Sequence, residues 1–188
     1  VVTAGTVDVR GSIAYVPQTA WITNETLRDN IVFGRAFDER HYARTLRAAA
    51  LTSDLKLLAD GDRTEIGERG INLSGGQKQR VSLARAVYAD ADVYLLDDPL
   101  SAVDAHVGRA IFENCIADAL ADKTVLLATH QLQFLHACDH IVVLSAGRVT
   151  EHGTYEALMR ADGDFCRLIC THVVGTGDDD DDDDDDDD

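Results

Sequence analysis

The sequence predicts an α/β fold with a parallel sheet, because short apolar runs lie among stretches with helical periodicity. Val93 to Leu96 is an apolar run followed by two acids and a proline, and Thr124 to Thr129 is a second run. Such runs are typical of parallel strands that are buried on both faces. Between these signals and the N-terminus, Lys78 to Tyr88 carries apolar residues at helical spacing.

Polar side chains close both apolar runs. Asp97 and Asp98 follow the first run, and His130 follows the second. Ligands of open α/β sheets bind outside the carboxyl ends of the strands. We therefore expect these three side chains to converge on one site.

The N-terminal half is expected to contain a hairpin, a short helix, a long helix and a loop. Alternating residues on both sides of Arg10-Gly11 predict two strands, and Asn24 or Thr26 is a candidate cap for the short helix. The periodicity then predicts one long helix and a loop rich in glycine and charge. The expected ranges are strands at 6–9 and 12–16, the long helix at 38–58 and the loop at 60–71.

The C-terminal part is expected to form a hairpin and two helices. Ser145-Ala146-Gly147 separates two apolar-rich stretches and predicts the turn of the hairpin. The expected ranges are 141–144 and 148–152 for the strands, and 154–159 and 165–170 for the helices.

Length and charge favour one domain followed by an acidic tail. The chain has 188 residues, 45% of them hydrophobic, which suits a single core. Asp178 to Asp188 are eleven consecutive aspartates, and without them 23 acids face 17 bases. We expect one domain over residues 1–177, a disordered tail over 178–188 and no nucleic-acid partner. The apolar runs are too short to span a membrane and no targeting segment is visible, so the chain is expected to be soluble by itself.

The stretch Leu73-Ser74-Gly75-Gly76-Gln77 combines a helix start with an unusual pair of glycines. Ser74 and Gln77 have the spacing of a capping box. A capping box does not explain two glycines in the first turn, since each costs about 1 kcal/mol relative to alanine in a helix. Glycines there allow a phosphate to approach the free N–H groups at the positive end of the helix. The stretch therefore favours anion binding.

Four segments in the correct order resemble the motifs of ATP-binding-cassette (ABC) ATPases. Residues 73–80 resemble the signature motif, 93–97 the Walker B strand and 101–104 the D-loop, while Tyr15-Val16-Pro17-Gln18 resembles the Q-loop. The resemblance implies a RecA-like P-loop NTPase core, here partial, with an inserted helical subdomain at about Trp21 to Arg85. It also implies ATP as ligand and Mg²⁺ as cofactor.

The resemblance assigns roles to individual residues. Asp97 and Gln18 would bind Mg²⁺, His130 would contact the γ-phosphate, and Asp98 stands where the family has its catalytic base. A second nucleotide-binding domain would pair with this one head to tail and sandwich two ATP molecules. Ser74, Gly75 and Gly76 would contact the γ-phosphate of the nucleotide held by that partner. Gln77 of the signature and Asp104 of the D-loop are also expected to bind nucleotide.

Further segments resemble the first nucleotide-binding domain of the multidrug-resistance-associated (C) subfamily. These are 61–68, 81–88 and 99–108, together with Asp98, where most of the family has Glu. Asp is one methylene shorter, and the first domain of that subfamily binds ATP tightly but hydrolyses it poorly. The resemblance implies an exporter of organic anions or thiol conjugates, with this domain at the cytoplasmic face of a membrane. Trp21 is equally compatible with a core residue and with a contact to the transmembrane domains.

The Walker A P-loop, G-x-x-x-x-G-K-[ST], is absent from the sequence. The chain has only three lysines, Lys56, Lys78 and Lys123, and none follows a glycine. We therefore expect no ATP hydrolysis by these residues alone, and a non-catalytic module that only donates its signature helix is the alternative function. A DNA-repair type of ABC ATPase is disfavoured, because no long insertion separates Gln18 from the signature.

The cysteines suggest no disulfide framework. None of the four has CxxC spacing, so reduced thiols are expected. His136, Cys138 and His140 alternate as metal ligands could, but a fourth ligand is missing from the pattern. Cys166 and Cys170 are expected to share a helix face as packed or exposed thiols.

Overall fold

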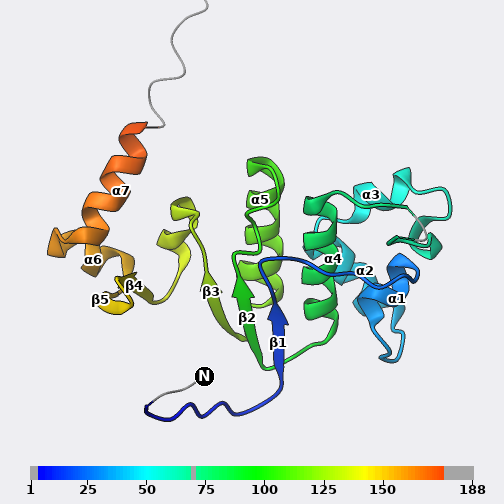
Figure 1. Cartoon of the computed structure of the whole chain (residues 1–188), viewed down its shortest axis with the longest axis horizontal. Coiled ribbons are helices and arrows are strands. Elements are labelled where there is room, and N and C mark those ends of the chain that lie inside the picture. Colours follow the sequence, from blue (N-terminus) through cyan, green and yellow to red (C-terminus); the bar gives the residue numbers. More distant parts are fainter. Residues whose placement is uncertain (1–3, 69–70, 176–188) are drawn as a thin grey trace, which may run out of the picture. The chain divides into compact units, whose positions relative to one another are not determined.

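Three parallel strands form the sheet of the first of two units in this chain (Figure 1). The computed structural model describes residues 4–68 and 71–175. In the sequence, the first unit ends at His130 and the second begins at Gln131. The strands are β1 (Ile13–Val16), β2 (Val93–Asp97) and β3 (Thr124–Ala128), in that order across the sheet. Their parallel register confirms the predicted α/β class.

The sheet is buried less completely than the apolar runs predicted. Ala14 and Val16 of β1 and Tyr94 and Leu96 of β2 are buried, whereas Leu126 of β3 is 66% exposed. The prediction of strands buried on both faces is therefore wrong for this sheet in the part of the chain that is described. The physical reason is that described segments cover only one face of β1 and β2.

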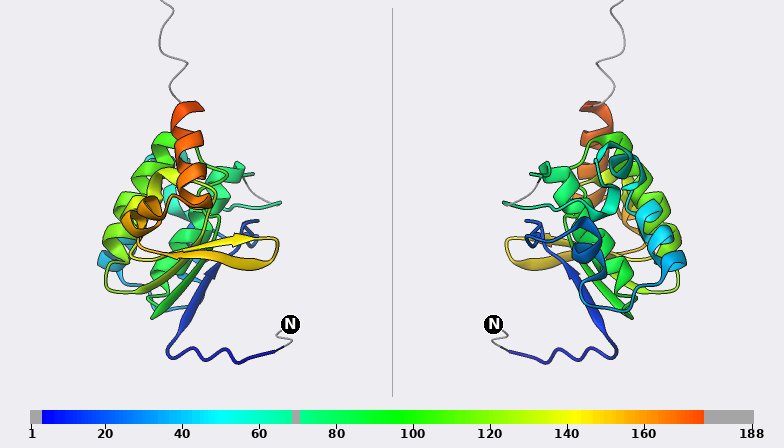
Figure 2. Two further views of the ribbon diagram at one scale, coloured as in Figure 1. Left: turned by 90° about the vertical axis from the view of Figure 1, so that its left-hand side faces the viewer. Right: turned by 90° about the vertical axis from the view of Figure 1, so that its right-hand side faces the viewer.

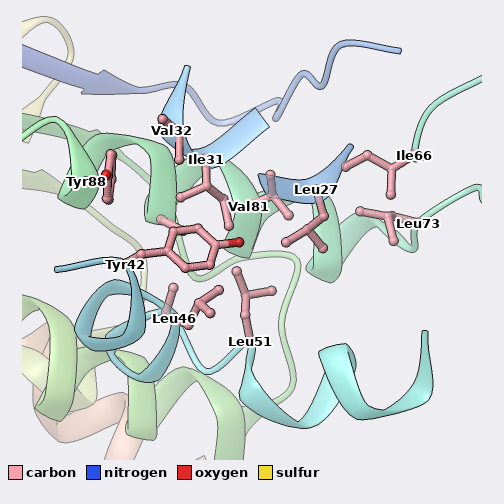
Figure 3. Close-up of a cluster of buried hydrophobic side chains, with 12 residues drawn as sticks. Leu27, Ile31, Val32, Tyr42, Leu46, Leu51, Ile66, Leu73, Val81 and Tyr88 are labelled. Carbon is pink, nitrogen blue, oxygen red and sulfur yellow. The ribbon is translucent and has the colours of Figure 1, made fainter. Parts of the chain in front are cut away.

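Helices α1 (Leu27–Val32), α2 (Glu39–Ala48), α3 (Thr52–Leu57) and α4 (Gly75–Tyr88) lie between β1 and β2 in the sequence. Thr26 caps α1 through the N–H of Asp29, as one of the two predicted caps. A separate core joins these helices, with Leu27, Ile31, Tyr42 and Val81 among its side chains (Figure 3). This core gives the helical segment its own packing apart from the sheet.

Two predicted elements of the first unit are wrong. Residues 6–9 form no strand, because no partner strand pairs with them in the described chain and an isolated hairpin is marginal in water. The single helix predicted over 38–58 is broken between α2 and α3, where Ala50 has φ +53. Its carbonyl accepts a hydrogen bond from Arg80 at 2.6 Å, which stabilises the break.

The remaining elements of the first unit are a turn beside the helices and a helix after β2. The loop predicted at 60–71 contains the 3₁₀ turn η1 (Gly61–Arg63) and a bridge between Thr26 and Glu65. After β2, helix α5 (Ala105–Ile111) continues as the π-helix η2 (Phe112–Ala119).

The second unit has the predicted hairpin and two helices (Figure 2). Its elements are η3 (Leu132–Ala137), β4 (Ile141–Ser145), β5 (Arg148–Gly153), α6 (Tyr155–Ala161) and α7 (Asp164–Gly175). Ala146 and Gly147 both have positive φ, which suits a two-residue hairpin turn. Ile141, Leu158, Phe165 and Ile169 form its core. The predicted tail, 178–188, lies outside the described residues.

None of the helices in residues 4–68 and 71–175 is both long enough and apolar enough to cross a lipid bilayer.

Leu27 offers a test of the helical core. Its side chain is 1% exposed, so Leu27→Ala should lower the free energy of unfolding by about 3 kcal/mol through lost burial and a cavity. Leu57 is 84% exposed, and Leu57→Ala is the matched control, with an expected change within about 0.5 kcal/mol. Urea unfolding followed by the fluorescence of the single tryptophan, Trp21, measures both. Equal midpoints for the two variants would contradict the assignment of this core.

Candidate functional site

The carboxyl edge of the sheet gathers the polar residues that close its strands. Gln18 follows β1, Asp97 ends β2, and His130 comes two residues after β3. Since the three strands are adjacent and parallel, these residues leave the sheet at the same edge. Tyr15 Oη also lies 3.4 Å from Asp97 Oδ2. The edge therefore presents a carboxylate, an amide and an imidazole, which suit a metal ion and phosphate oxygens.

Asp98 is the most constrained residue of this edge. Its N–H donates to the carbonyl of Ala128 at 2.8 Å, and its own carbonyl accepts from Ser101 Oγ at 2.9 Å. Its backbone is left-handed, with φ +46. The residue is only 7% exposed, and its Oδ1 is buried with no hydrogen-bond partner among the described residues. A buried acceptor without a donor costs about 1–3 kcal/mol, so this carboxylate fits a site in which a ligand or water supplies the proton.

The start of α4 is fixed by the capping box that the sequence predicted. Ser74 Oγ accepts from the N–H of Gln77 at 3.2 Å, and Gln77 Oε1 accepts from the N–H of Ser74 at 2.9 Å. Gln77 Nε2 also donates to Asp54 Oδ1 at 2.8 Å, and Asp54 makes an ion pair with Arg80. Both amide atoms of the Gln77 side chain thus hold the helix start, whereas Gly75 has open space around its Cα.

The signature segment and the D-loop segment meet at Gly76. A Cβ at Gly76 would lie 2.7 Å from the carbonyl oxygen of Ala102, whereas a Cβ at Gly75 would meet nothing within 4 Å. The two segments line an open hollow of about 300 Å³. Its lining residues are Ser74, Gly75, Gly76, Arg80, Ala102, Val103, Asp104 and Val107.

Asp104 lies in this hollow and also caps α5. Its Oδ1 accepts a hydrogen bond from the N–H of Val107 at 2.9 Å. The structure thus places most of the predicted residues in two groups, one at the sheet edge and one at the hollow. Gln77 does not line the hollow, because its side chain is bonded to Ser74 and Asp54. The first N–H groups of α4 have no acceptor within their own helix, and they can bind an anion in the hollow.

Two positioning residues, Gln79 and Arg85, were missed by the sequence analysis. Gln79 Nε2 donates to the carbonyl of Pro17 at 3.2 Å, and both Nη atoms of Arg85 lie 3.3 Å from the carbonyl of Trp21. Helix α4 therefore holds the chain on both sides of Gln18. The sequence did contain an indication of a buried role for Arg85. It is four residues after Val81, so this charged residue lies within the apolar stripe of α4.

Arg85 also supports an exposed aromatic patch formed by Trp21 and Phe33. The two rings pack edge to face with centroids 5.5 Å apart, and the guanidinium lies 3.9 Å from the centre of the Trp21 ring. Burial lowers the pKa of Arg85 to about 10, so it remains a cation at neutral pH. Trp21 is 45% exposed and Phe33 is 43% exposed. Trp21 is consequently a half-exposed surface residue rather than a core residue in the described structure.

The alternating residues His136, Cys138 and His140 do not assemble as ligands. His136 packs against Tyr155, and His140 packs against His152. Across residues 4–68 and 71–175, no group of three or more His, Cys, Asp or Glu side chains is arranged to hold a metal ion. A Mg²⁺ ion needs no such group, because in phosphate sites it usually keeps several water ligands. Asp97 and Gln18 could therefore hold this ion together with water.

Comparison with known proteins identifies a matching family model and several similar proteins. A family model described as "ABC transporter" matches residues 3–101. ABC transporter C family member 12 of Dictyostelium discoideum is 55% identical over 165 residues, which are 88% of this chain and 12% of that protein. ATP-binding cassette sub-family C member 3 of Homo sapiens is 55% identical over 170 residues, or 89% of this chain and 11% of that protein. ABC transporter C family member 13 of Oryza sativa subsp. indica is 56% identical over 168 residues, again 89% and 11%.

The two glycines of α4 provide a matched pair for the contact with residues 101–104. Gly76→Ala should lower the free energy of unfolding by about 1–3 kcal/mol, because its Cβ would collide with backbone. Gly75→Ala should be neutral or stabilising by up to about 1 kcal/mol, because the added methyl meets open space and favours the helix. Urea unfolding of both variants measures the difference. Equal stabilities would mean that the two segments do not touch at Gly76.

Proposed function

The chain belongs to the ABC transporter family, whose ATPase domain has the RecA-like P-loop NTPase fold, and we propose that in the intact protein it binds and hydrolyses ATP to drive export. Its similarity to C-subfamily members supports a nucleotide-binding domain of an ABC exporter. The chain corresponds to only 11–12% of the length of these relatives, so the remaining activities below are proposed for the whole protein.

The observation that carries the proposal is the buried carboxylate of Asp98 beside Asp97. Its Oδ1 lacks a donor among the described residues, which is the state expected of a base that accepts a proton from water. The sheet edge also supplies ligands for the metal and the phosphate. Asp97 would hold Mg²⁺ through water, and Gln18 would reach the same ion. Mg²⁺ neutralises charge on the phosphate oxygens when bound.

His130 and Asp98 would act on the attacking water from the ends of adjacent strands. His130 would contact the γ-phosphate and orient the water, and Asp98 would accept its proton. The Asp98 side chain reaches one methylene less far than Glu, and a misplacement of about 1 Å can cost on the order of a hundredfold in rate. We therefore propose that this site binds ATP and turns it over slowly.

The hollow at Ser74, Gly75 and Gly76 would serve the nucleotide of a partner domain. The first turn of α4 lines this hollow, and Asp104 lies in it as well. A second nucleotide-binding domain bound head to tail would place its γ-phosphate there. Two ATP molecules would then join the two domains.

The aromatic patch of Trp21 and Phe33 is the proposed contact with the transmembrane domains. It is apolar, half exposed and linked by Arg85 to the segment that carries Gln18. Movement at the nucleotide can therefore reach the patch through α4. In this proposal the domain lies at the cytoplasmic face of a membrane, and the cargo is an organic anion or a thiol conjugate.

Lengthening Asp98 tests the hydrolytic part of the proposal in the full-length protein. Asp98→Glu should place the carboxylate against the attacking water and raise hydrolysis at this site, since a well-placed general base contributes about 10² to 10⁴ in rate. The measurement is single-turnover ATP hydrolysis with the catalytic glutamate of the other domain changed to glutamine.

His130→Ala in the Asp98→Glu background is the control. It should abolish the gain, because the water would lose its second orienting group. If Asp98→Glu leaves the rate unchanged, Asp98 is not the limiting base. The alternative of a domain that only donates its signature helix then becomes the better description.

The docking surface has a separate test in membrane vesicles. Trp21→Ala should reduce ATP-dependent uptake of a glutathione conjugate at least about tenfold, while ATP labelling of this domain is retained, because buried aromatic anchors dominate interfaces. Trp21→Phe should preserve most of the uptake, and Leu57→Ala, at an exposed site outside the patch, should have no effect. Normal uptake by Trp21→Ala would exclude the patch as the docking surface.

A further inference from the structure

Two cysteines on α7 lie one helical turn apart with their sulfur atoms close together. The Sγ atoms of Cys166 and Cys170 are 4.0 Å apart. Cys170 is exposed and Cys166 is half-buried. Both belong to the second unit, whereas every residue given a role above lies before residue 131. The proposed ATPase function therefore does not explain the pair.

The helix keeps these two cysteines from forming a disulfide with each other. Residues at i and i+4 of an α-helix have Cβ atoms about 5–6 Å apart. A disulfide needs Cβ atoms about 3.5–4.5 Å apart. Oxidation of the pair would thus require α7 to unwind locally. While the helix is intact, the two thiols do not form this bond with each other.

A single bridging atom fits the same spacing without unwinding. Bonds of about 2.3 Å from a tetrahedral metal ion to two thiolates place the sulfur atoms about 3.8 Å apart. The observed 4.0 Å is close to this span, and small side-chain rotations can close the difference. Thiolates are soft ligands, so they select soft ions.

We propose that Cys166 and Cys170 form a two-thiol site for a soft, thiophilic metal or metalloid centre.

The rest of the second unit holds α7 so that the site is preorganised. Phe165 and Ile169 are buried in the core of this unit, one residue before each cysteine. The carboxylate of Glu151 accepts hydrogen bonds from the N–H groups of Asp164 at 2.6 Å and Phe165 at 3.1 Å. The helix start and its inner face are therefore fixed, and both cysteines are held beside that face.

The chemistry of an arsenoxide suits a pair of thiols, because one arsenoxide condenses with two of them. Two As–S bonds form, the As–O bond breaks, and the two S–H protons leave with the oxygen as water, so nothing is oxidised or reduced.

Phenylarsine oxide is the probe, because its arsenic has two positions for sulfur. We expect a one-to-one adduct of the purified chain, seen by intact-protein mass spectrometry, that survives excess monothiol and is released by a 1,2-dithiol. Cys166→Ser and Cys170→Ser should each lower retention against monothiol at least tenfold. The double variant Cys115→Ser/Cys138→Ser should retain the adduct, because these two thiols are not part of the pair.

Two further measurements make the assignment specific. Trypsin cleaves after Arg167, between the cysteines, so the adduct should keep the peptides on either side joined until a 1,2-dithiol is added. The double variant Leu168→Cys/Cys170→Ser moves the second thiol to the far side of the helix and should lose retention. Separation of the peptides in the wild-type adduct, or full retention by either single serine variant or by the relocated thiol, would overturn the proposal.

Discussion

The buried guanidinium of Arg85 joins three segments that are distant in the sequence. Its Nε donates to the carbonyl of Asn30 at 2.7 Å, its Nη2 to Asn30 Oδ1 at 3.1 Å, and its Nη atoms lie 3.3 Å from the carbonyl of Trp21. No carboxylate pairs with it among the described residues, so neutral oxygens and the Trp21 ring solvate the charge. Loss of the guanidinium would remove a donor from the carbonyls of Asn30 and Trp21, and each buried acceptor left unsatisfied costs about 1–3 kcal/mol. Asn30 Oδ1 would keep its hydrogen bonds from Thr23. The arrangement of α1, α4 and the segment after β1 depends on it.

Helix α4 is consequently a rigid connection between the two groups of site residues. Its N-terminal turn contacts Ala102 through Gly76, and its inner face holds the carbonyls of Pro17 and Trp21. A shift of the helix start must therefore move the segment that carries Gln18, or break buried hydrogen bonds. Binding of nucleotide at the hollow and binding of nucleotide at the sheet edge would then be coupled through helix α4, which would move as a rigid element.

Local chemistry made the elements with strong caps and turns predictable from the sequence. Ser74 with Gln77, Thr26, and the turn at Ala146-Gly147 all lie where their side chains or backbone preferences indicated. Long-range effects were not predictable. The break at Ala50 depends on Arg80, thirty residues away. Residues 6–9 have strand-like alternation, but none of the strands that the structure describes pairs with them. The same limit explains why Arg85 was missed, since its acceptors come from two other segments.

The left-handed backbone at Asp98 has a consequence for which acids can occupy this position. Asp and Asn tolerate positive φ better than longer or branched residues, because their short polar side chains bond locally. The main chain is also fixed there by the carbonyl of Ala128 and by Ser101. The left-handed backbone therefore favours a short acid at the position where the proposed hydrolysis would need a longer one. Under the proposed function, nucleotide would stay bound for longer at this site, and the duration of binding would matter more than the rate of turnover.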